Sequence, residues 1–442
     1  MLQTVREILQ SKYFFLLPLL EAVLITVFAK PLEGTVAFVC LICVLLIVSE
    51  NTAVTLLPFS LFCMFVLKEY DSFDRFVKLW WLAIPLVIAL LFHFLVYREH
   101  PKHSFLLYGV IAVAAAITLG GVGSISAEEY FTPASLYYIC GLGIVMVLMH
   151  EMVSAKYHDR KRFVVSDYVA SVFYATGIYA TFMVFEEYLT RLDEVKAAGK
   201  LLDLQWSNNI ATFLMIALPF AFYACKKHIW HLPVTVCMLA AMMLTGSRAA
   251  LILGVVEYVL CTAVFFILDR RHWYWYLLVI CVLGGMFVAF RTQFMTFFES
   301  AMLHFDNIES ETRYQMALRS WTEFKQNPFF GSGLGATGRQ DIYNPKKFAM
   351  NWYHSAPFQI FGSLGIFGIL GYGFLWFTRG KTFWEHRTVF GFTVLLSQLN
   401  LFAMSMVNPG FFCPFPYEFY MVLLFAVLAR TELTPKKRSA LS

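Results

Sequence analysis

Charged residues are scarce in this sequence. Of its 442 residues, 14% are Asp, Glu, Lys or Arg, whereas 59% are hydrophobic. A soluble domain of this length needs far more charge to cover its surface, so most of the chain must be solvated by lipid. The net charge of +5 is small and spread over short connections, which excludes a basic groove for nucleic acid.

Metal-ligand and nucleotide-binding patterns are also lacking. The nine cysteines fall mostly inside apolar runs, and the C-x-x-C spacing of Cys40 and Cys43 lies within a predicted span. Gly333 to Gly338 match the glycine spacing of a dinucleotide-binding loop, but no strand precedes them and no amphipathic helix follows, so this interpretation is rejected. No repeat of fixed period is found, and we expect the first apolar run to be retained rather than cleaved as a signal.

Apolar runs long enough to cross the hydrocarbon core of a bilayer recur throughout the chain. We count about fourteen, and we predict an all-α polytopic integral membrane protein with about 12–14 transmembrane helices. We expect them to form a single transmembrane domain, 1–442. The predicted spans are 13–30, 34–49, 52–68, 77–97, 104–125, 131–152, 168–188, 207–225, 232–246, 249–268, 274–291, 355–377, 388–406 and 417–430.

The distribution of basic residues predicts the orientation of the chain. Lys and Arg in short loops are retained preferentially on the cytoplasmic side of a membrane. With about fourteen spans, all basic clusters fall on one side, so both termini are predicted to be cytoplasmic, in a cytoplasmic (inner) membrane. The clusters are Arg98–His103, Lys156–Arg162, Lys226–His228, Arg270–His272, Arg379–Arg387 and Lys436–Arg438.

The longest non-membrane stretch, 292–354, is predicted to lie on the opposite, extracytoplasmic side. Loops this long are usually functional or disordered. This one contains Trp321, Phe324 and an amphipathic run over 312–326, which favours a folded loop. We therefore expect the loop to carry part of an active site.

Arg248 follows Ser247 in a tight turn at the extracytoplasmic end of a predicted span. An arginine there can bind a phosphate, because its planar guanidinium pairs with oxyanions in a bidentate manner and stays charged. The alternative is an interfacial arginine that extends its charged group into the headgroup region.

Arg313 lies near the start of the amphipathic run, which we expect to be capped by Ser310 or Thr312. Its charge beside the positive end of a helix dipole suits a bound diphosphate. The alternative is an ion pair with Glu309 or Glu311. Two acidic residues alone seldom hold a divalent cation, so no metal site is predicted there.

His354 stands where the long loop returns to the membrane. A histidine titrates near neutrality and can take a proton from a hydroxyl group. The alternative is an interfacial histidine bonded to a carbonyl group. Without further information this alternative is favoured, because half-buried histidines with such a partner are common in proteins. The helix that follows carries Gly362, Gly365 and Gly368, and we interpret this i, i+3 spacing as a small stripe that allows close approach of a helix or lipid chain.

Three stretches together resemble the O-antigen ligase and polymerase superfamily of membrane glycosyltransferases. The first opens at Trp206-Ser-Asn-Asn209 and runs to Pro219, similar to an Asn-x-x-Ala run at the start of a span. The second is Thr245-Gly-Ser-Arg248-Ala-Ala, similar to a Ser-Arg-Gly/Ala turn. The third begins at Arg313, passes through Asn327-Pro-Phe-Phe-Gly331-Ser-Gly333, and continues from His354 to Gly365 and Gly368. Two residues beside His354 depart from the family pattern: Ser355 replaces the usual Asn, and Pro357 is unexpected so close to the histidine.

This resemblance, over about residues 200–372, implies inverting, metal-independent glycosyl transfer on the outer face of the membrane, with no cofactor. The donor would be a glycan on an undecaprenyl diphosphate carrier, and the acceptor a hydroxyl of a glycan or glycolipid. Arg248 and Arg313 would bind the diphosphate, and His354 would activate the acceptor. The matching positions Asn209, Ser247, Gly331, Gly333 and Ser355 would contribute to substrate binding.

Other functions remain open on the sequence. The resemblance does not separate a ligase from a polymerase that extends lipid-linked repeat units. A transporter or lipid-linked-glycan flippase would also have many spans, but such proteins usually show repeated halves and central polar residues. A peptidoglycan-type polymerase would be expected to use an outer carboxylate instead.

Overall fold

Every regular element in the described part of the chain is a helix, which confirms the predicted all-α fold. The structure is a computed structural model that describes residues 8–9, 11–68, 76, 78–97, 104–123, 139–155, 163–198, 201–202, 204, 207–289, 291–292, 295, 309–334, 353–408, 411–412 and 417–431. It does not describe the side chains at positions 53, 155, 196, 198 and 309–313.

The hydropathy of these helices confirms a polytopic membrane protein. Five are long and apolar enough to cross a membrane, and shorter apolar helices accompany them in every other predicted span. The five are Pro31–Val48, Val165–Thr190, Ser207–Lys227, Arg248–Leu268 and Ala356–Glu385.

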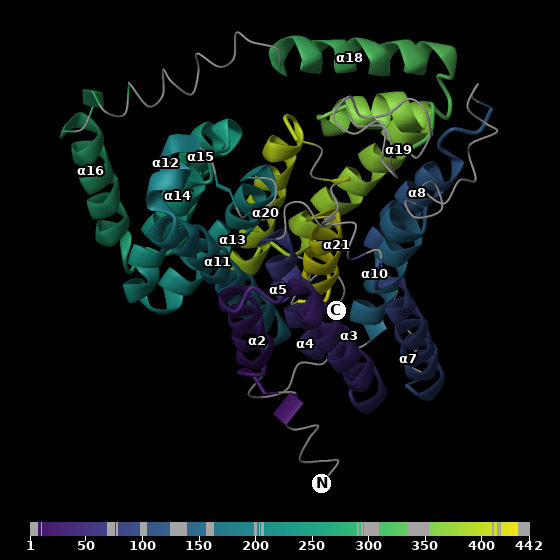
Figure 1. Ribbon diagram of the computed structural model, residues 1–442, viewed down its shortest axis with the longest axis horizontal. Coiled ribbons are helices and arrows are strands. Elements are labelled where there is room, and N and C mark those ends of the chain that lie inside the picture. Colours follow the sequence, from purple (N-terminus) through teal and green to yellow (C-terminus); the bar gives the residue numbers. More distant parts are fainter. Residues whose placement is uncertain are drawn as a thin grey trace. The chain divides into compact units, whose positions relative to one another are not determined.

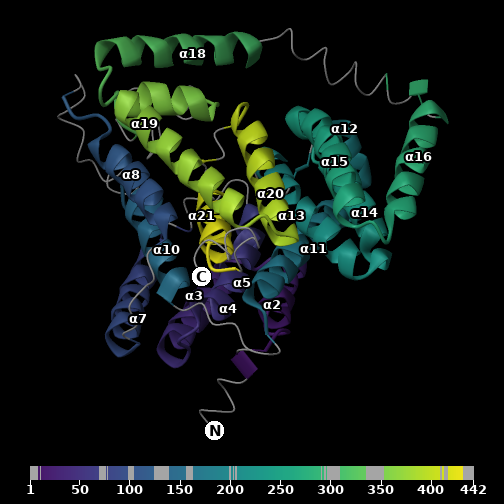
Figure 2. The same ribbon diagram turned by 180° about the vertical axis from the view of Figure 1, so that it is seen from behind.

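The helices divide into two compact units, each made from two stretches of the chain. Unit 1 comprises Met1–Lys102 and Met152–Trp273, and unit 2 comprises His103–Glu151 and Tyr274–Ser442. Figures 1 and 2 show their helices from opposite sides. The single domain expected over 1–442 stays a prediction.

Unit 1 is built around a helix that is buried on all sides. Its helices are α2 (Leu16–Val27), α3 (Pro31–Val48), α4 (Thr52–Thr55), α5 (Leu57–Phe62), η1 (Cys63–Lys68), η2 (Trp80–Leu82), α7 (Ala83–Val96), α11 (Val165–Thr190), α12 (Leu192–Ala198), α13 (Ser207–Lys227), η5 (Ile229–His231), α14 (Leu232–Leu244) and α15 (Arg248–Leu268). The central one is α13, which is buried from Asn209 to Phe222 and packs against α11, α14 and α15. A helix with apolar residues around its whole circumference must be enclosed in this way.

Unit 2 is organised by the contact between α8 and α19. Its helices are α8 (Phe105–Leu119), η4 (Ile139–Ile144), α10 (Val145–Ala155), α16 (Trp273–Ala289), α18 (Glu309–Gln326), α19 (Ala356–Glu385), α20 (Val389–Ser405) and α21 (Tyr417–Leu428), with the ends of α10 and α16 at the boundary of the unit. A Cβ added at Gly109 would lie 2.9 Å from the Cα of Leu375, and one at Gly371 would lie 3.0 Å from the carbonyl oxygen of Ala112. Small residues therefore allow the two backbones to approach closely, as is common in membranes.

The predicted glycine stripe on α19 is wrong as a continuous face, although Gly362 does lie at a close approach of α18. Gly365 has φ 61° and ψ −152°, so it interrupts the helix instead of continuing a face of it. Gly362 lies against Ser320 and Tyr353, and Gly371 makes the close approach to α8.

Arg379 corrects the predicted basic cluster Arg379–Arg387. Its side chain is buried within α19, bonds to Gln398 at 2.6 Å and pairs with Glu418 at 2.8 Å. A charge in the membrane interior is costly unless it is paired, and this pairing joins α19, α20 and α21. Arg379 is thus part of the helix core, Lys381 also lies within α19, and of this cluster only His386 and Arg387 come after the helix.

Candidate active site

The helix α19 is broken at Gly365, and its hydrogen bonding shows how the break is accommodated. In a continuous helix the N–H groups of Ile366 and Phe367 would bond to the carbonyls of Gly362 and Ser363. The break separates both pairs. Each polar group left buried without a partner would cost about 1–3 kcal/mol, so the break requires partners from elsewhere.

A short segment of the long loop supplies all of these partners. We call residues 327–334 the bracing loop. Four backbone hydrogen bonds replace the two that α19 loses at its break. They run from Ile366 N to Pro328 O (2.8 Å), Phe367 N to Phe329 O (3.1 Å), Ser332 N to Gly362 O (2.8 Å) and Gly333 N to Ser363 O (2.9 Å).

The two glycines predicted to bind substrate make the bracing loop possible. Gly331 and Gly333 have φ of 64° and 86°, in the left-handed region that favours glycine. A Cβ at Gly331 would lie 2.4 Å from the carbonyl carbon of Ser363. The Asn327 side chain donates to the Gly331 carbonyl at 3.0 Å and so closes the turn. Their contact with substrate stays a prediction.

His354 lies directly before this broken helix and has an unusual backbone. Among the described non-glycine residues, His354 (φ 50°) and Ala29 have positive φ. This conformation costs an L-residue roughly 1–2 kcal/mol, and such costs concentrate at functional sites. Tyr353 N donates to the Gln359 side chain at 3.2 Å, and the Ser355 carbonyl accepts from Gln359 N at 2.8 Å. The first turn of α19 therefore holds the backbone on both sides of His354.

The departures from the family pattern fit the start of α19. Ser355 is the extended N-cap residue, and Pro357 occupies the first turn. Proline is tolerated there because that N–H has no partner within the helix.

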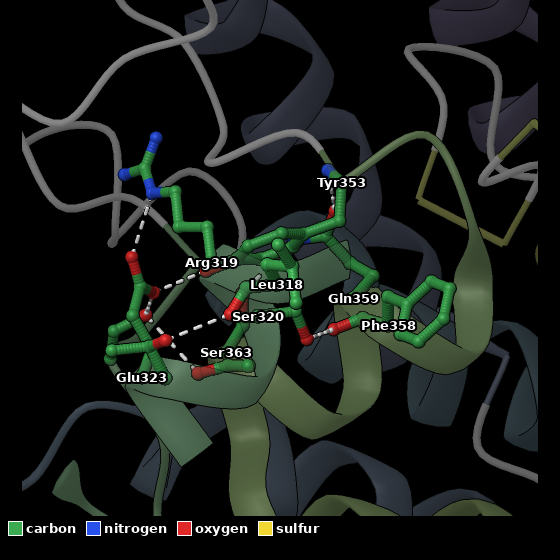
Figure 3. Close-up of polar contacts among 11 residues, drawn as sticks. Leu318, Arg319, Ser320, Glu323, Tyr353, Phe358, Gln359 and Ser363 are labelled. Atoms are coloured by element: carbon green, nitrogen blue, oxygen red, sulfur yellow. Dashed lines mark hydrogen bonds and ion pairs between the residues drawn. The ribbon is translucent and has the colours of Figure 1, made fainter. Parts of the chain in front are cut away.

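A buried carboxylate, that of Glu323, bonds to Tyr353, the residue before His354, at a point where three segments of the chain meet. Glu323 of α18 accepts hydrogen bonds from Arg319 Nε at 2.8 Å, from the Ser332 hydroxyl and from the Tyr353 hydroxyl. The Ser320 hydroxyl donates to the Phe358 carbonyl at 2.6 Å, which fixes α18 on the first part of α19. Figure 3 shows these contacts, and Figures 1 and 2 show α18 alongside that part of α19.

In unit 1, the predicted Ser247–Arg248 turn begins the helix α15. Gly246 has φ 75°, and Ser247 is the N-cap residue, whose hydroxyl accepts from Ala250 N at 3.2 Å. The same hydroxyl donates to the Asn208 side chain at 2.6 Å. Arg248 is the first residue of the helix and is half-buried. A helix N-terminus that also carries a guanidinium favours a negatively charged ligand.

The structure places the predicted site residues in two groups. Asn209, Ser247 and Arg248 lie in unit 1, and the others lie in unit 2. Arg313 is on α18, whose helix starts at Glu309, so Ser310 and Thr312 are inside it and the predicted cap is wrong. Acidic residues suit a first helical turn, which explains the earlier start. Within unit 2, α18 packs on α19, the helix that His354 precedes. The predicted roles of these residues stay predictions.

Sequence reasoning missed several polar residues of these groups. The Asn208 side chain bonds to Ser247, and counting back from Ala211 in the Asn-x-x-Ala run would have indicated this residue. The spacing of Arg319 and Glu323 indicates a local ion pair, but the contact between Glu323 and Tyr353 joins positions 30 residues apart and left no signal in the sequence. In the described residues no group of three His, Cys, Asp or Glu is arranged to hold a metal ion.

Comparison with known proteins bears on the central part of the chain. Residues 233–373 match the family model for O-antigen ligases. The resemblance to the O-antigen ligase superfamily is confirmed. The matched segment runs from α14 into α19, so it contains every predicted site residue except Asn209. No curated protein matches the chain. The match supports a general function in the O-antigen ligase and polymerase family, acting on glycans and lipids.

Proposed function

We propose that this chain is an inverting glycosyltransferase that moves a glycan from an undecaprenyl diphosphate carrier to an acceptor hydroxyl. The observation that carries the proposal is the O-antigen ligase match, which spans the Ser247–Arg248 turn, Arg313 and the strained His354 in one segment. The acceptor is a glycan or glycolipid, as in a ligase, or a lipid-linked repeat unit, as in a polymerase.

The reaction is a single displacement at the anomeric carbon of the donor. The acceptor oxygen bonds to this carbon as the bond to the diphosphate oxygen breaks, and the hydroxyl proton passes to the His354 imidazole. Arg248 and Arg313 stabilise the charge on the departing diphosphate. The diphosphate oxygen gains a negative charge as the bond breaks, and in this proposal the two guanidinium groups stabilise it without a metal ion or a proton donor.

The proposed reaction takes place on the extracytoplasmic face of the cytoplasmic membrane, with both termini cytoplasmic. Basic residues cluster in connections on the opposite side from the long loop, which supports this orientation. An undecaprenyl carrier stays in the bilayer, so a site at the end of membrane helices meets both the lipid and a water-soluble acceptor.

Site variants in proteoliposomes test this function. Lipid-linked glycans and acceptors extracted from the host's envelope serve as substrates, and product is followed by gel and mass spectrometry. We expect His354→Ala to lower kcat by roughly 100-fold or more, the usual share of a general base. Arg248→Gln and Arg313→Gln should also weaken binding of undecaprenyl diphosphate to the purified protein.

Lys325→Gln on the exposed face of α18 and Arg271→Gln in a predicted cytoplasmic connection are matched controls for loss of a positive charge, and both should transfer normally. Normal transfer by His354→Ala would overturn the mechanism. Movement of labelled carrier across the bilayer without transfer would indicate a flippase instead.

A further inference from the structure

Glu323 is a buried carboxylate at the centre of a group of hydrogen bonds in unit 2. Only 4% of its surface is exposed. Burying a charged group is costly unless it is paired and hydrogen-bonded. Arg319 Nε, at 2.8 Å, supplies a positive charge, and two hydroxyl groups complete its hydrogen bonding. The carboxylate therefore acts as an acceptor for three donors at once.

These donors come from three different segments of the chain. Arg319 belongs to α18 itself, Ser332 to the bracing loop and Tyr353 to the segment that enters α19. The Ser332 backbone also bonds to Gly362, beside the break in α19. One side chain thus ties α18 to both segments that surround the start of α19 (Figure 3).

Tyr353 carries this link to His354, its neighbour in the chain. Its side chain is 2% exposed and its hydroxyl is committed to Glu323, while its N–H is committed to Gln359. A residue anchored at both ends cannot rotate freely. Since His354 holds a left-handed φ of 50°, its direction depends on how firmly Tyr353 is fixed.

We propose that Glu323 is a positioning residue, which orients His354 through Tyr353 and holds the bracing loop through Ser332. This inference rests on the proposed function, in which His354 receives the acceptor proton. Glu323 itself takes no part in the proton transfer. Its contribution is to fix the imidazole within the narrow range of geometry that a general base requires.

Glu323→Gln is the first test, because it keeps the size of the side chain and removes its charge. The NH2 group of the glutamine side chain is a hydrogen-bond donor, whereas the three neighbours of Glu323 are themselves all donors, so at least one of these hydrogen bonds would be lost. We expect kcat per folded molecule to fall about 10- to 100-fold, the scale expected for a small misplacement of a catalytic group. KM for the donor and binding of undecaprenyl diphosphate should change less than about twofold, because Glu323 does not touch the diphosphate in this account.

Tyr353→Phe removes the hydroxyl that links Glu323 to His354 and tests the same link from its other end. We expect a fall in kcat in the same direction, and the double variant should be little worse than the more severe single variant, since both act through one contact. Gln326→Glu, the reverse exchange on the exposed face of α18, is the control and should keep the activity of the unmodified protein.

The outcomes separate this inference from the proposed function. Normal transfer by His354→Ala would remove the proposed function itself. Loss of transfer in His354→Ala together with normal kcat in Glu323→Gln would overturn the positioning role alone. If Glu323→Gln does not fold, Tyr353→Phe decides: normal kcat in that variant, or effects that multiply in the double variant, would contradict the link.

Discussion

At the scale of single residues, the neighbours of His354 hold the backbone on both sides of it. Tyr353 and Ser355 each bond to Gln359, and Tyr353 also bonds to Glu323. The positive φ of His354 is the conformation that these bonds leave available. A substitution at any of these neighbours should therefore change the orientation of the imidazole without removing it.

Tyr353 should make the protein less stable as the pH rises into the alkaline range. Burial and the Glu323 carboxylate beside it raise the pKa of Tyr353 well above its ordinary value near 10. Above pH ~10 the unfolded chain releases this proton while the folded protein keeps it, so the free energy of unfolding falls as pH rises. We expect Tyr353→Phe to be less stable near pH 8 but to lose less stability between pH 9 and 11, measured as apparent Tm in detergent.

The exposed Tyr314 on α18 provides the control, because Tyr314→Phe should follow the profile of the unmodified protein. Parallel profiles for Tyr353→Phe and the unmodified protein would show that the phenol is not held as described.

Hydropathy could not reveal which residues of α18 face inward. In this helix Trp321 is 51% exposed whereas Glu323 is 4% exposed, the reverse of what an apolar stripe predicts. The reason is that Ser332 and Tyr353 provide donors for Glu323 from distant positions. Arg248, Ser247 and His354 were predicted as site residues because each stands at a recognisable turn or boundary, and their roles stay predictions.

At the scale of elements, the break at Gly365 divides α19 into two parts. The part after Gly365 contains about 20 residues and is roughly 30 Å long, enough to cross the hydrocarbon core unaided. The part before it lies along α18 (Figures 1 and 2). The predicted span 355–377 began one residue before α19, but it missed both the break and the end at Glu385. Three glycines at i, i+3 spacing fit a continuous helix, and only the bracing loop shows that one of them interrupts it.

Replacing Gly365 tests the break directly. Its φ and ψ are almost confined to glycine, and an added Cβ would lie 2.6 Å from the Pro328 carbonyl oxygen. We expect Gly365→Ala to lose about 1–3 kcal/mol of stability and to reduce glycosyl transfer, because the bracing loop must move. Thermal unfolding in detergent and the transfer assay measure the two effects.

Gly373, in the continuous part of α19, gives the matched comparison. An added Cβ there meets nothing within 4 Å, and alanine favours a helix by roughly 0.5–1 kcal/mol. Gly373→Ala should be at least as stable as the unmodified protein. Equal stability for the two variants would contradict the described break.

At the scale of the whole molecule, composition predicted the class of the protein and the positions of its apolar helices well. Each predicted span contains an apolar helix in the described residues. Charge counting was less accurate, since Arg379 is buried against Glu418 and carries no loop signal. The division into two units and the pairing of distant polar residues depend on tertiary packing, which local periodicity does not encode.

Single cysteines at exposed positions test the proposed orientation. Thr322→Cys on α18 should react with a membrane-impermeant maleimide in intact spheroplasts, because the long loop is proposed to lie outside. Arg271→Cys, in a predicted cytoplasmic connection, should react only after permeabilisation. The opposite pattern would place the loop in the cytoplasm and exclude the proposed face.

The measurement that tests the central claim most directly is the identity of the carrier released during transfer. Mass spectrometry of the lipid phase, in proteoliposomes supplied with the host's lipid-linked glycan and acceptor, should find one undecaprenyl diphosphate per glycan transferred. His354→Ala should release almost none. Release of undecaprenyl monophosphate, or an undiminished release of the diphosphate by His354→Ala, would contradict a displacement at the anomeric carbon that depends on His354.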